Sequence, residues 1–396
     1  MNVVDLMSKH KVIGVDTMSE YLLSIVVPTK NRYKFLYSLI KQICYINDKR
    51  IELVIQDNTE DNKEFEGYLN DHSFPFIHYY WDDKQYTVCE NSDLGVLHAK
   101  GEYICFVGDD DIVSRHLIGF IEKMQEEGID GAIFNRAVYD WPGVTRVATH
   151  TFNVTIPRFT GEKIHLNGTK EQHKILQRCG TSLGRLPSLY QGVIRKSVLD
   201  KVRDACGTYF PGPSPDMGIA IVLPYYIGEY VYCDLPLVSS GASPKSAAGL
   251  GAKHQHKGEL KNKSFLPSDI EEQWEKRIPM IWTAETIYAQ SIFAALKNAK
   301  KEHNLKLFNF EYLYAGFAMF ERDYKGLLKN PNIEGTYNKG KYNLYYASLF
   351  IQRIYWFIYN RTIKRLNLDG TKHYDDIKDS FAAMKIIDDE IKSKGF

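Results

Sequence analysis

The chain lacks several features by which whole classes of protein are recognised. No apolar run is long enough to span a bilayer. The first twenty residues carry Asp5, Asp16 and Glu20 and no long apolar stretch, so they do not resemble a secretory signal. The formal net charge is only +1, which gives no overall field to attract nucleic acid. We therefore expect a cytoplasmic protein with no nucleic-acid partner.

Cysteine pairs and glycine-rich loops are also missing. The six cysteines are scattered without a close pair, which is typical of neither a zinc site nor a disulfide framework and fits a reducing compartment. No G-x-G-x-x-G or Walker-type loop occurs, so dinucleotide-binding and P-loop functions are not indicated. A functional site must therefore be sought in other motifs.

The chain does have enough apolar material for a full core. Its 396 residues, 44% of them hydrophobic, point to more than one domain. Between residues 22 and 133, short apolar runs alternate with amphipathic stretches. This pattern predicts strands at 22–27, 51–55, 74–80, 103–107 and 131–135, and helices at 33–45, 92–100 and 114–127. Such alternation predicts a mainly parallel sheet covered by helices.

The remaining two thirds of the chain differ in character. Residues 138–252 are less regular, and candidate helices follow at 274–296, 310–328 and 344–366. We therefore predict an N-terminal extension (1–21), an α/β domain (22–260) and a helical C-terminal region (261–396).

Polar segments follow three of the predicted strands, at 28–32, 56–59 and 108–111. Parallel sheets bind ligands beyond the carboxyl ends of their strands, so these segments outline one site. Its sharpest feature is the Asp109, Asp110 and Asp111 triplet, because adjacent carboxylates are costly unless a cation or donors satisfy them. Mg²⁺ or Mn²⁺ would do so and would bridge a nucleotide diphosphate. The alternative is a solvated acidic turn that caps a helix beginning near residue 114.

Four segments taken together resemble the family 2 glycosyltransferases with the GT-A fold. They are 24–32 (SIVVPTKNR), 52–58 (ELVIQDN), 91–104 (NSDLGVLHAKGEYI) and 106–111 (FVGDDD), and their order and spacing match. The resemblance covers residues 22–124. It implies a GT-A α/β fold, which is a Rossmann-like, mainly parallel sheet with flanking helices. Residues 22–111 would then form the nucleotide-sugar half and residues 112–260 the acceptor half.

The resemblance also implies roles for single residues. The donor-binding residues would be Pro28, Thr29, Asn31, Arg32, Asp57, Asn91, Asp109 and Asp110. Asp111, together with Asp109, would hold the Mn²⁺ or Mg²⁺ ion. Gly108 stands where many members have Asp, so the register of the motif stays open by one residue. Asp57 would also fit an ordinary turn.

Two residues further along the chain complete the expected site. Inverting members place a catalytic carboxylate on a loop that faces the acceptor, and Asp216 in the segment PSPDMG is the candidate general base. Its alternative role is the N-cap of the apolar helix that follows. Lys245 would meet a donor phosphate as a point charge, although an ordinary solvated lysine is the plainer explanation.

Residues 339–366 combine many basic and apolar side chains with no acid. A basic helix with aromatic edges is typical of peripheral contact with an anionic membrane, here the inner face of the cytoplasmic membrane. The alternative is a core helix or a subunit interface, which would make the chain a homo-oligomer. Both interpretations stay open.

We therefore expect a metal-dependent, inverting glycosyltransferase. Its donor would be a nucleotide sugar, a UDP-sugar by family tendency, and its acceptor a glycan or lipid-linked glycan in bacterial capsule or lipopolysaccharide synthesis. A sugar-phosphate nucleotidyltransferase is one alternative, but residues 28–32 lack the glycine-rich loop it would need. A non-catalytic glycan-binding or scaffold protein on the same fold is the other, and the intact Asp triplet argues against it.

Overall fold

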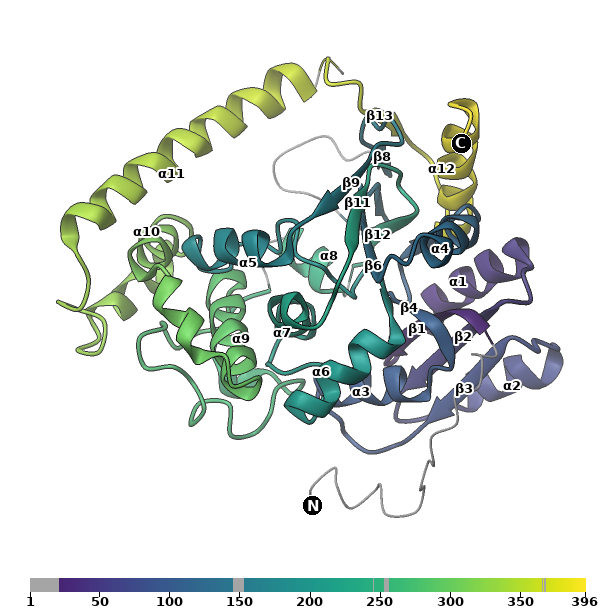
Figure 1. Ribbon diagram of the computed structural model, residues 1–396, viewed down its shortest axis with the longest axis horizontal. Coiled ribbons are helices and arrows are strands. Elements are labelled where there is room, and N and C mark those ends of the chain that lie inside the picture. The colour runs from purple at the N-terminus through teal and green to yellow at the C-terminus, as the bar shows by residue number, and fades with distance from the viewer. Residues whose placement is uncertain (1–20, 145–152, 245, 253–255, 365, 367) are drawn as a thin grey trace.

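The computed structural model describes residues 21–144, 153–244, 246–252, 256–364, 366 and 368–396 (Figure 1). Its strands are β1 (Tyr21–Thr29), β2 (Ile51–Asp57), β3 (Ile77–Trp81), β4 (Gly101–Phe106), β5 (Ile112–Val113), β6 (Gly131–Phe134), β7 (Val138–Asp140), β8 (Val154–Ile156), β9 (Lys163–Leu166), β10 (Gly192–Arg195), β11 (Tyr230–Cys233), β12 (Val238–Ala242) and β13 (Lys372–Tyr374). Its α-helices are α1 (Tyr33–Ile46), α2 (Lys63–Asp71), α3 (Val88–His98), α4 (Leu117–Glu126), α5 (Gly168–Gln177), α6 (Lys196–Cys206), α7 (Pro215–Val222), α8 (Ala247–Ala252), α9 (Ala284–Asn298), α10 (Phe310–Phe320), α11 (Lys339–Tyr359) and α12 (Ser380–Ser393).

The main sheet has the strand order β3-β2-β1-β4-β10-β6-β11-β9. Strands β1 to β4 are parallel to one another, as the alternation in the sequence predicts. Strand β10 then runs antiparallel to both β4 and β6, and β9 runs antiparallel to β11. The α/β fold with a large sheet and flanking helices is therefore confirmed, and the second half of the sheet is mixed.

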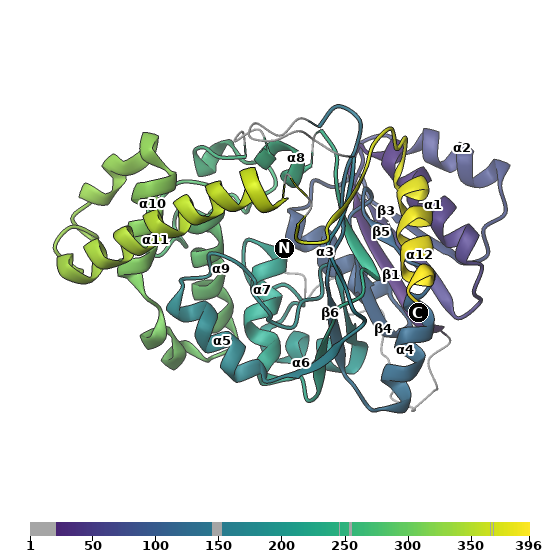
Figure 2. The same ribbon diagram turned by 90° about the horizontal axis from the view of Figure 1, so that it is seen from above.

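Helices cover both faces of this sheet, as Figure 2 shows. Along β1, Leu23, Ile25 and Val27 point to one face, and Val26 points to the other. The first face packs against α1, α2, α4 and α12, and the second packs against α3, α5, α6, α7 and α9. All four of these β1 side chains are fully buried, so the strand that leads into the predicted site is fixed on both sides.

A second, smaller sheet has the order β13-β8-β7-β12-β5. Its strand β5 begins immediately after the Asp triplet, and β12 pairs with both β5 and β7. This sheet therefore brings residues 138–140 and 238–242 beside the carboxyl end of β4.

Several helices begin or end at other residues than the sequence predicts. The helix expected at 92–100 begins at Val88, because Thr87 and Glu90 form a capping box. The helix expected at 274–296 begins only at Ala284, after Thr283 as N-cap, and Pro279 lies in the turns before it. The helix expected at 310–328 ends at Phe320 and continues as a 3₁₀ segment. The helix expected at 344–366 is α11, which begins five residues earlier.

The end of the chain returns to the sheet. Gln42 of α1 donates from Nε2 to Ser380 Oγ at 2.9 Å, and Ser114 Oγ donates to Asp388 Oδ1 at 2.6 Å. Contacts therefore cross the predicted domain boundary at residue 260. The boundary marks only where the sequence pattern changes, and it stays a prediction. Of the predicted N-terminal extension, only Tyr21 lies within the described residues. No helix in the described ranges is long and apolar enough to cross a membrane.

Packing of α12 predicts that the C-terminus contributes to global stability. Ile387 is fully buried among side chains of the main sheet's first face. We expect Ile387→Ala to lower the free energy of unfolding by about 2–5 kcal/mol, because it leaves a cavity in the core. Urea unfolding would measure this, with the exposed Asp389→Ala as the control. Equal stability of the two variants would contradict the packing of α12 described above.

Candidate functional site

The three polar strand ends meet at one edge of the main sheet. Thr29 at the end of β1 lies in register with Asp57 at the end of β2. Val26 of β1 pairs with Phe106 of β4, so the triplet that follows β4 lies beside the residues that follow β1. The sequence predicts this arrangement correctly, because parallel neighbours bring their carboxyl ends together.

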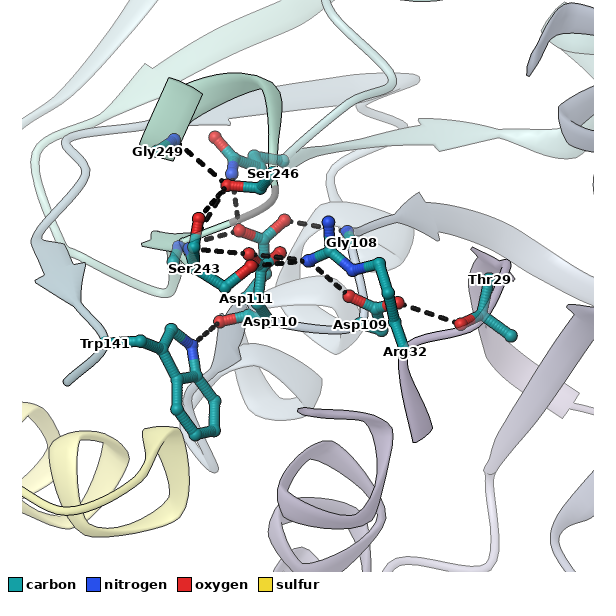
Figure 3. A network of polar contacts seen from close by, with 12 residues as sticks. Thr29, Arg32, Gly108, Asp109, Asp110, Asp111, Trp141, Ser243, Ser246 and Gly249 are labelled. Atoms are coloured by element: carbon teal, nitrogen blue, oxygen red, sulfur yellow. Dashed lines mark hydrogen bonds and ion pairs between the residues drawn. The ribbon is translucent and has the colours of Figure 1, made fainter. Parts of the chain in front are cut away.

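Arg32 pairs with two carboxylates of the triplet (Figure 3). Its Nη2 lies 2.7 Å from Asp109 Oδ1 and 2.7 Å from Asp110 Oδ2, and it donates to Ser243 Oγ at 2.9 Å. Thr29 Oγ1 donates to Asp109 Oδ2 at 2.8 Å. The Arg32 side chain keeps 22% of its surface exposed, whereas the two aspartates are almost completely buried. Arg32 is thus the most exposed group of this cluster.

Burial governs the protonation of this cluster. Removal from solvent raises the pKa of Asp109, and the charge of Asp110 raises it further, while Arg32 and the Thr29 hydroxyl act against both. Burial also lowers the pKa of Arg32, but the two carboxylates outweigh it and the net shift is upward. The guanidinium therefore stays charged and holds the two carboxylates together.

Asp111 is held by three neutral donors. It is fully buried, and it accepts hydrogen bonds from Gly108 N at 2.8 Å, Gly241 N at 2.8 Å and Gln191 Nε2 at 2.9 Å. Burial and the neighbouring Asp110 raise its pKa, and these donors lower it. Because the donors come from three separate segments, Asp111 connects the end of β4 to β12 and to the start of β10.

Mg²⁺ and Mn²⁺ bind through oxygen ligands, and the carboxylates of the triplet differ in the number of oxygen atoms they leave free for such an ion. Asp111 is fully buried, and each of its oxygens accepts at least one hydrogen bond. In the described part of the chain, Asp110 Oδ1 is the triplet oxygen with neither a donor nor an ion-pair partner. No group of three or more metal-ligating side chains occurs among the described residues. The residues therefore fit an ion that Asp110 would hold together with ligand phosphates.

The other predicted donor-binding residues have different environments. Asp57 is fully buried and accepts from Tyr33 OH at 2.6 Å, Tyr79 OH at 2.8 Å and Thr59 N at 2.9 Å. Both of its oxygens are thus already satisfied within the protein.

Pro28, Asn31 and Asn91 lie around the same strand ends. Pro28 is aligned with Gln56 in the sheet. Asn31 is exposed in a left-handed conformation, with φ of 58°, and its backbone N–H donates to Thr59 Oγ1. Asn91 donates from Nδ2 to the Gln56 carbonyl at 3.3 Å, while its buried Oδ1 has no partner among the described residues. That oxygen is available to a ligand donor. Lys245 lies outside the described residues.

Asp216 occupies the first turn of α7, after Ser214 and Pro215. Its Oδ1 accepts from the Ser214 hydroxyl and from Met217 N, and its Oδ2 accepts from Tyr288 OH at 2.6 Å. Burial raises the pKa of Tyr190 well above its usual range, and the charges of Asp111, Asp110 and Asp216 raise it further. Tyr190 therefore lies within electrostatic range of both the triplet and Asp216.

A cavity lies next to Gln191, the side chain that donates to Asp111. Its lining includes Arg136, Arg185, Ser188, Tyr190, Gln191 and Tyr232. The Gln191 side chain links the two places, because it donates to Asp111 and accepts from Arg136 Nη1 at 2.8 Å and from Ser240 Oγ at 2.7 Å. Gln191 adopts φ of 55°, a costly conformation that persists only where the surroundings require it.

Sequence inspection does not identify Arg136 or Tyr288 as functional residues. Neither stands in a motif, and each reaches the site only through the tertiary fold.

Comparison with known proteins adds an independent result. Residues 24–202 match the sequence model of Glycosyl transferase family 2. The glycosyltransferase GlyG of Streptococcus pneumoniae serotype 4 is 30% identical over 128 residues, which are 31% of this chain. That alignment spans 41% of the curated relative, so the chain matches less than half of its length.

Solved structures with a similar arrangement include glycosyltransferases. Residues 1–349 of TarS from S. aureus in complex with UDP give a TM-score of 0.44 at 16% identity, over 76% of this chain and 73% of that one. The mannosyltransferase PcManGT from Pyrobaculum calidifontis, in complex with GDP-Man and Mn²⁺, gives a TM-score of 0.41 at 10% identity. The match covers 98% of this chain and 93% of that one.

The close approach of β12 to the triplet yields a prediction. A Cβ at Gly241 would lie 1.7 Å from the Asp110 carbonyl oxygen, so Gly241→Ala forces the triplet backbone to move. We expect this variant to lower the thermal midpoint and to lose any ligand that binds at the triplet. The control is Gly119→Ala, which meets nothing within 4 Å in α4 and should be neutral or slightly stabilising. Unchanged behaviour of Gly241→Ala in both assays would contradict the geometry.

Proposed function

We propose that this chain is a glycosyltransferase, because residues 24–202 match the sequence model of Glycosyl transferase family 2. It moves a sugar from a nucleotide-activated donor to an acceptor hydroxyl. The observation that carries the proposal is the convergence of Thr29, Arg32 and the Asp triplet at one sheet edge. Gln191 connects this edge to a cavity, and Tyr190 of that cavity lies within electrostatic range of Asp216.

The donor is proposed to bind over the triplet. Arg32 is charged and accessible, and it contributes a planar donor suited to phosphate oxygens. Thr29 and Asp109 lie toward β1 and β2, where the nucleoside is expected, and the free Asn91 oxygen accepts from a ligand hydroxyl or amine there. We propose a UDP-sugar as the first donor to test, because of the tendency of the family that the sequence resembles.

The proposed metal ligand is Asp110 rather than Asp111. This proposal is supported by the oxygens of the two carboxylates: among the described residues Asp110 Oδ1 has no hydrogen-bond or ion-pair partner, whereas both oxygens of Asp111 accept hydrogen bonds. Mg²⁺ or Mn²⁺ bound there would offset the charge of the departing nucleotide diphosphate. Asp111 instead keeps the backbone of residues 108–111 in place through its contacts with β12 and Gln191.

Asp216 is proposed as the general base. It removes the proton from the acceptor hydroxyl as that oxygen forms a bond to the anomeric carbon. The bond from this carbon to the phosphate oxygen breaks at the same time, and the nucleoside diphosphate leaves with the bonding electrons. Attack from the side opposite the leaving group inverts the anomeric centre. Tyr288 and Ser214 orient the carboxylate, and the cavity around Tyr190 and Gln191 would receive the acceptor.

The proposed acceptor is a glycan or lipid-linked glycan of the bacterial surface, such as capsule or lipopolysaccharide. This part of the proposal is supported by the family resemblance alone. A non-catalytic glycan-binding or scaffold role is the second candidate. One observation favours it, because Arg32 and neutral donors already satisfy most oxygens of the triplet without a metal ion.

Thermal shift with nucleotides tests the donor site first. In the presence of Mn²⁺, we expect one nucleoside diphosphate to raise the midpoint of the native chain, because ligand binding stabilises the folded state. Asp110→Asn should abolish the metal-dependent part of this shift. It should change the metal-free midpoint less than Asp111→Asn does, because Asp111 accepts three structural hydrogen bonds.

Two results would count against this assignment. The first is a metal-dependent shift that survives in Asp110→Asn but not in Asp111→Asn, while the two variants have equal thermal midpoints without metal. This result would assign the metal ion to Asp111. The absence of any nucleotide shift at millimolar concentration in the native chain favours the scaffold role.

Asp216→Asn tests the base. We expect it to cut turnover by about two to four orders of magnitude while the nucleotide shift stays unchanged, because general-base help is lost and the donor contacts remain. Tyr288→Phe should cause a smaller loss, since it only releases the carboxylate. Asp200→Asn in α6 is the matched control, because Asp200 also accepts from a tyrosine, Tyr209, at 2.8 Å. Full turnover in Asp216→Asn would remove Asp216 from the mechanism.

A further inference from the structure

Helix α11 is attached to the protein along only one of its faces. Its first half packs on α10, where Leu349 is buried against Ala315 and Met319, with Tyr342 and Tyr346 beside them. Leu349 is the one buried residue of the helix. Figure 1 shows α11 running along the outer side of the helical region, from α10 back toward β13.

Large apolar side chains cover the rest of α11. Leu344, Ile351, Ile354 and Ile358, which we name the α11 stripe, are 68%, 66%, 45% and 54% exposed and recur at helical spacing. Phe350, Tyr355 and Phe357 lie among them and are each more than half exposed. Every residue from Phe350 to Ile358 is exposed. A monomeric protein in water rarely leaves so continuous an apolar surface uncovered, so α11 needs a partner.

The charged residues of this segment all have the same sign. Lys339, Lys341, Arg353 and Arg361 are exposed, and no acidic residue occurs from residue 339 to residue 366. Within the ranges that the structure describes, none of these four cations makes an ion pair. The surface that covers the α11 stripe must therefore also accept several positive charges that have no ion-pair partner among the described residues.

A second copy of α11 meets only half of this requirement. The α11 stripe has the spacing of a coiled-coil seam, but Arg361 falls on the next seam position. Paired helices would also place their cations near one another with no acid on either partner to offset them. An anionic lipid surface meets both needs, since its acyl region takes the apolar side chains and its headgroups attract the cations.

We infer that α11 is an interfacial anchor that lies on an anionic membrane, with the α11 stripe in the acyl boundary. Arg353, in the middle of the helix, requires it to lie along the surface. The face that packs on α10 then points away from the lipid, so the rest of the protein stays in water. This inference does not depend on the transferase reaction.

Vesicle co-sedimentation of the full chain tests it. We expect binding to vesicles of equal parts phosphatidylcholine and phosphatidylglycerol, and little binding to phosphatidylcholine alone. The double variant Ile351→Glu/Ile354→Glu should lose the binding, whereas Leu97→Glu, at an exposed apolar position of α3, should keep it. Arg353→Gln/Arg361→Gln should weaken binding roughly five-fold for each cation removed.

Three outcomes overturn the inference. One is absence of binding to anionic vesicles by a folded native chain, and another is equal binding to neutral vesicles. The third is a stable oligomer in light scattering that Ile351→Glu/Ile354→Glu dissociates, without vesicle binding, which assigns the α11 stripe to a second copy. Nucleotide thermal shifts on the same variants separate these outcomes from failure of the donor site, because α11 holds none of its residues.

Discussion

Compensation of negative charge at the end of β4 is the constraint on which the candidate site depends. Three consecutive carboxylates there are nearly removed from solvent, and each ionised group must be satisfied locally or become protonated. Arg32 supplies the positive charge for Asp109 and Asp110, and neutral donors serve Asp111. The solution therefore requires the loop after β1, the start of β10 and the end of β12 to meet at one point. Gly241 is needed because any side chain there would collide with the triplet backbone.

The need to compensate this charge gives the three aspartates different contacts. Asp111 accepts its hydrogen bonds from Gly108 N, Gly241 N and Gln191 Nε2, so its contacts hold three segments together. Asp110 instead shares the Arg32 guanidinium with Asp109, and in the proposed function it exchanges this cation for a bound ion. Arg32 keeps part of its surface in solvent, so incoming phosphate would compete for it. Binding at the site would then redistribute the contacts of Arg32 without disturbing those of Asp111.

Sequence patterns predict the parts of this arrangement that depend on neighbours along the chain. The buried runs of β1, β2 and β4 are local signals, and parallel pairing places Thr29, Asp57 and Asp109 at one edge. The same patterns do not show that Tyr33 and Tyr79 satisfy Asp57, because these tyrosines come from a helix and a strand on either side. Tyr288 is not identified from the sequence either, since its contact with Asp216 arises from the fold. The return of α12 to the sheet is missed for the same reason, because its apolar pattern does not tell which surface it will cover.

The path of the C-terminal segment gives α11 a mechanical role as well as a surface. Before α11 the chain is part of the helices packed on the second face of the sheet, through α9 and α10. After α11 it crosses to the first face, where β13 pairs with β8 and α12 packs on α1 (Figure 2). Helix α11 therefore packs on α10, and the chain that follows it returns to the core at β13. A partner that binds the α11 stripe would hold the whole molecule in one orientation. The edge that carries Arg32 and the triplet would then face a fixed direction relative to that partner, which a freely tethered helix would not achieve.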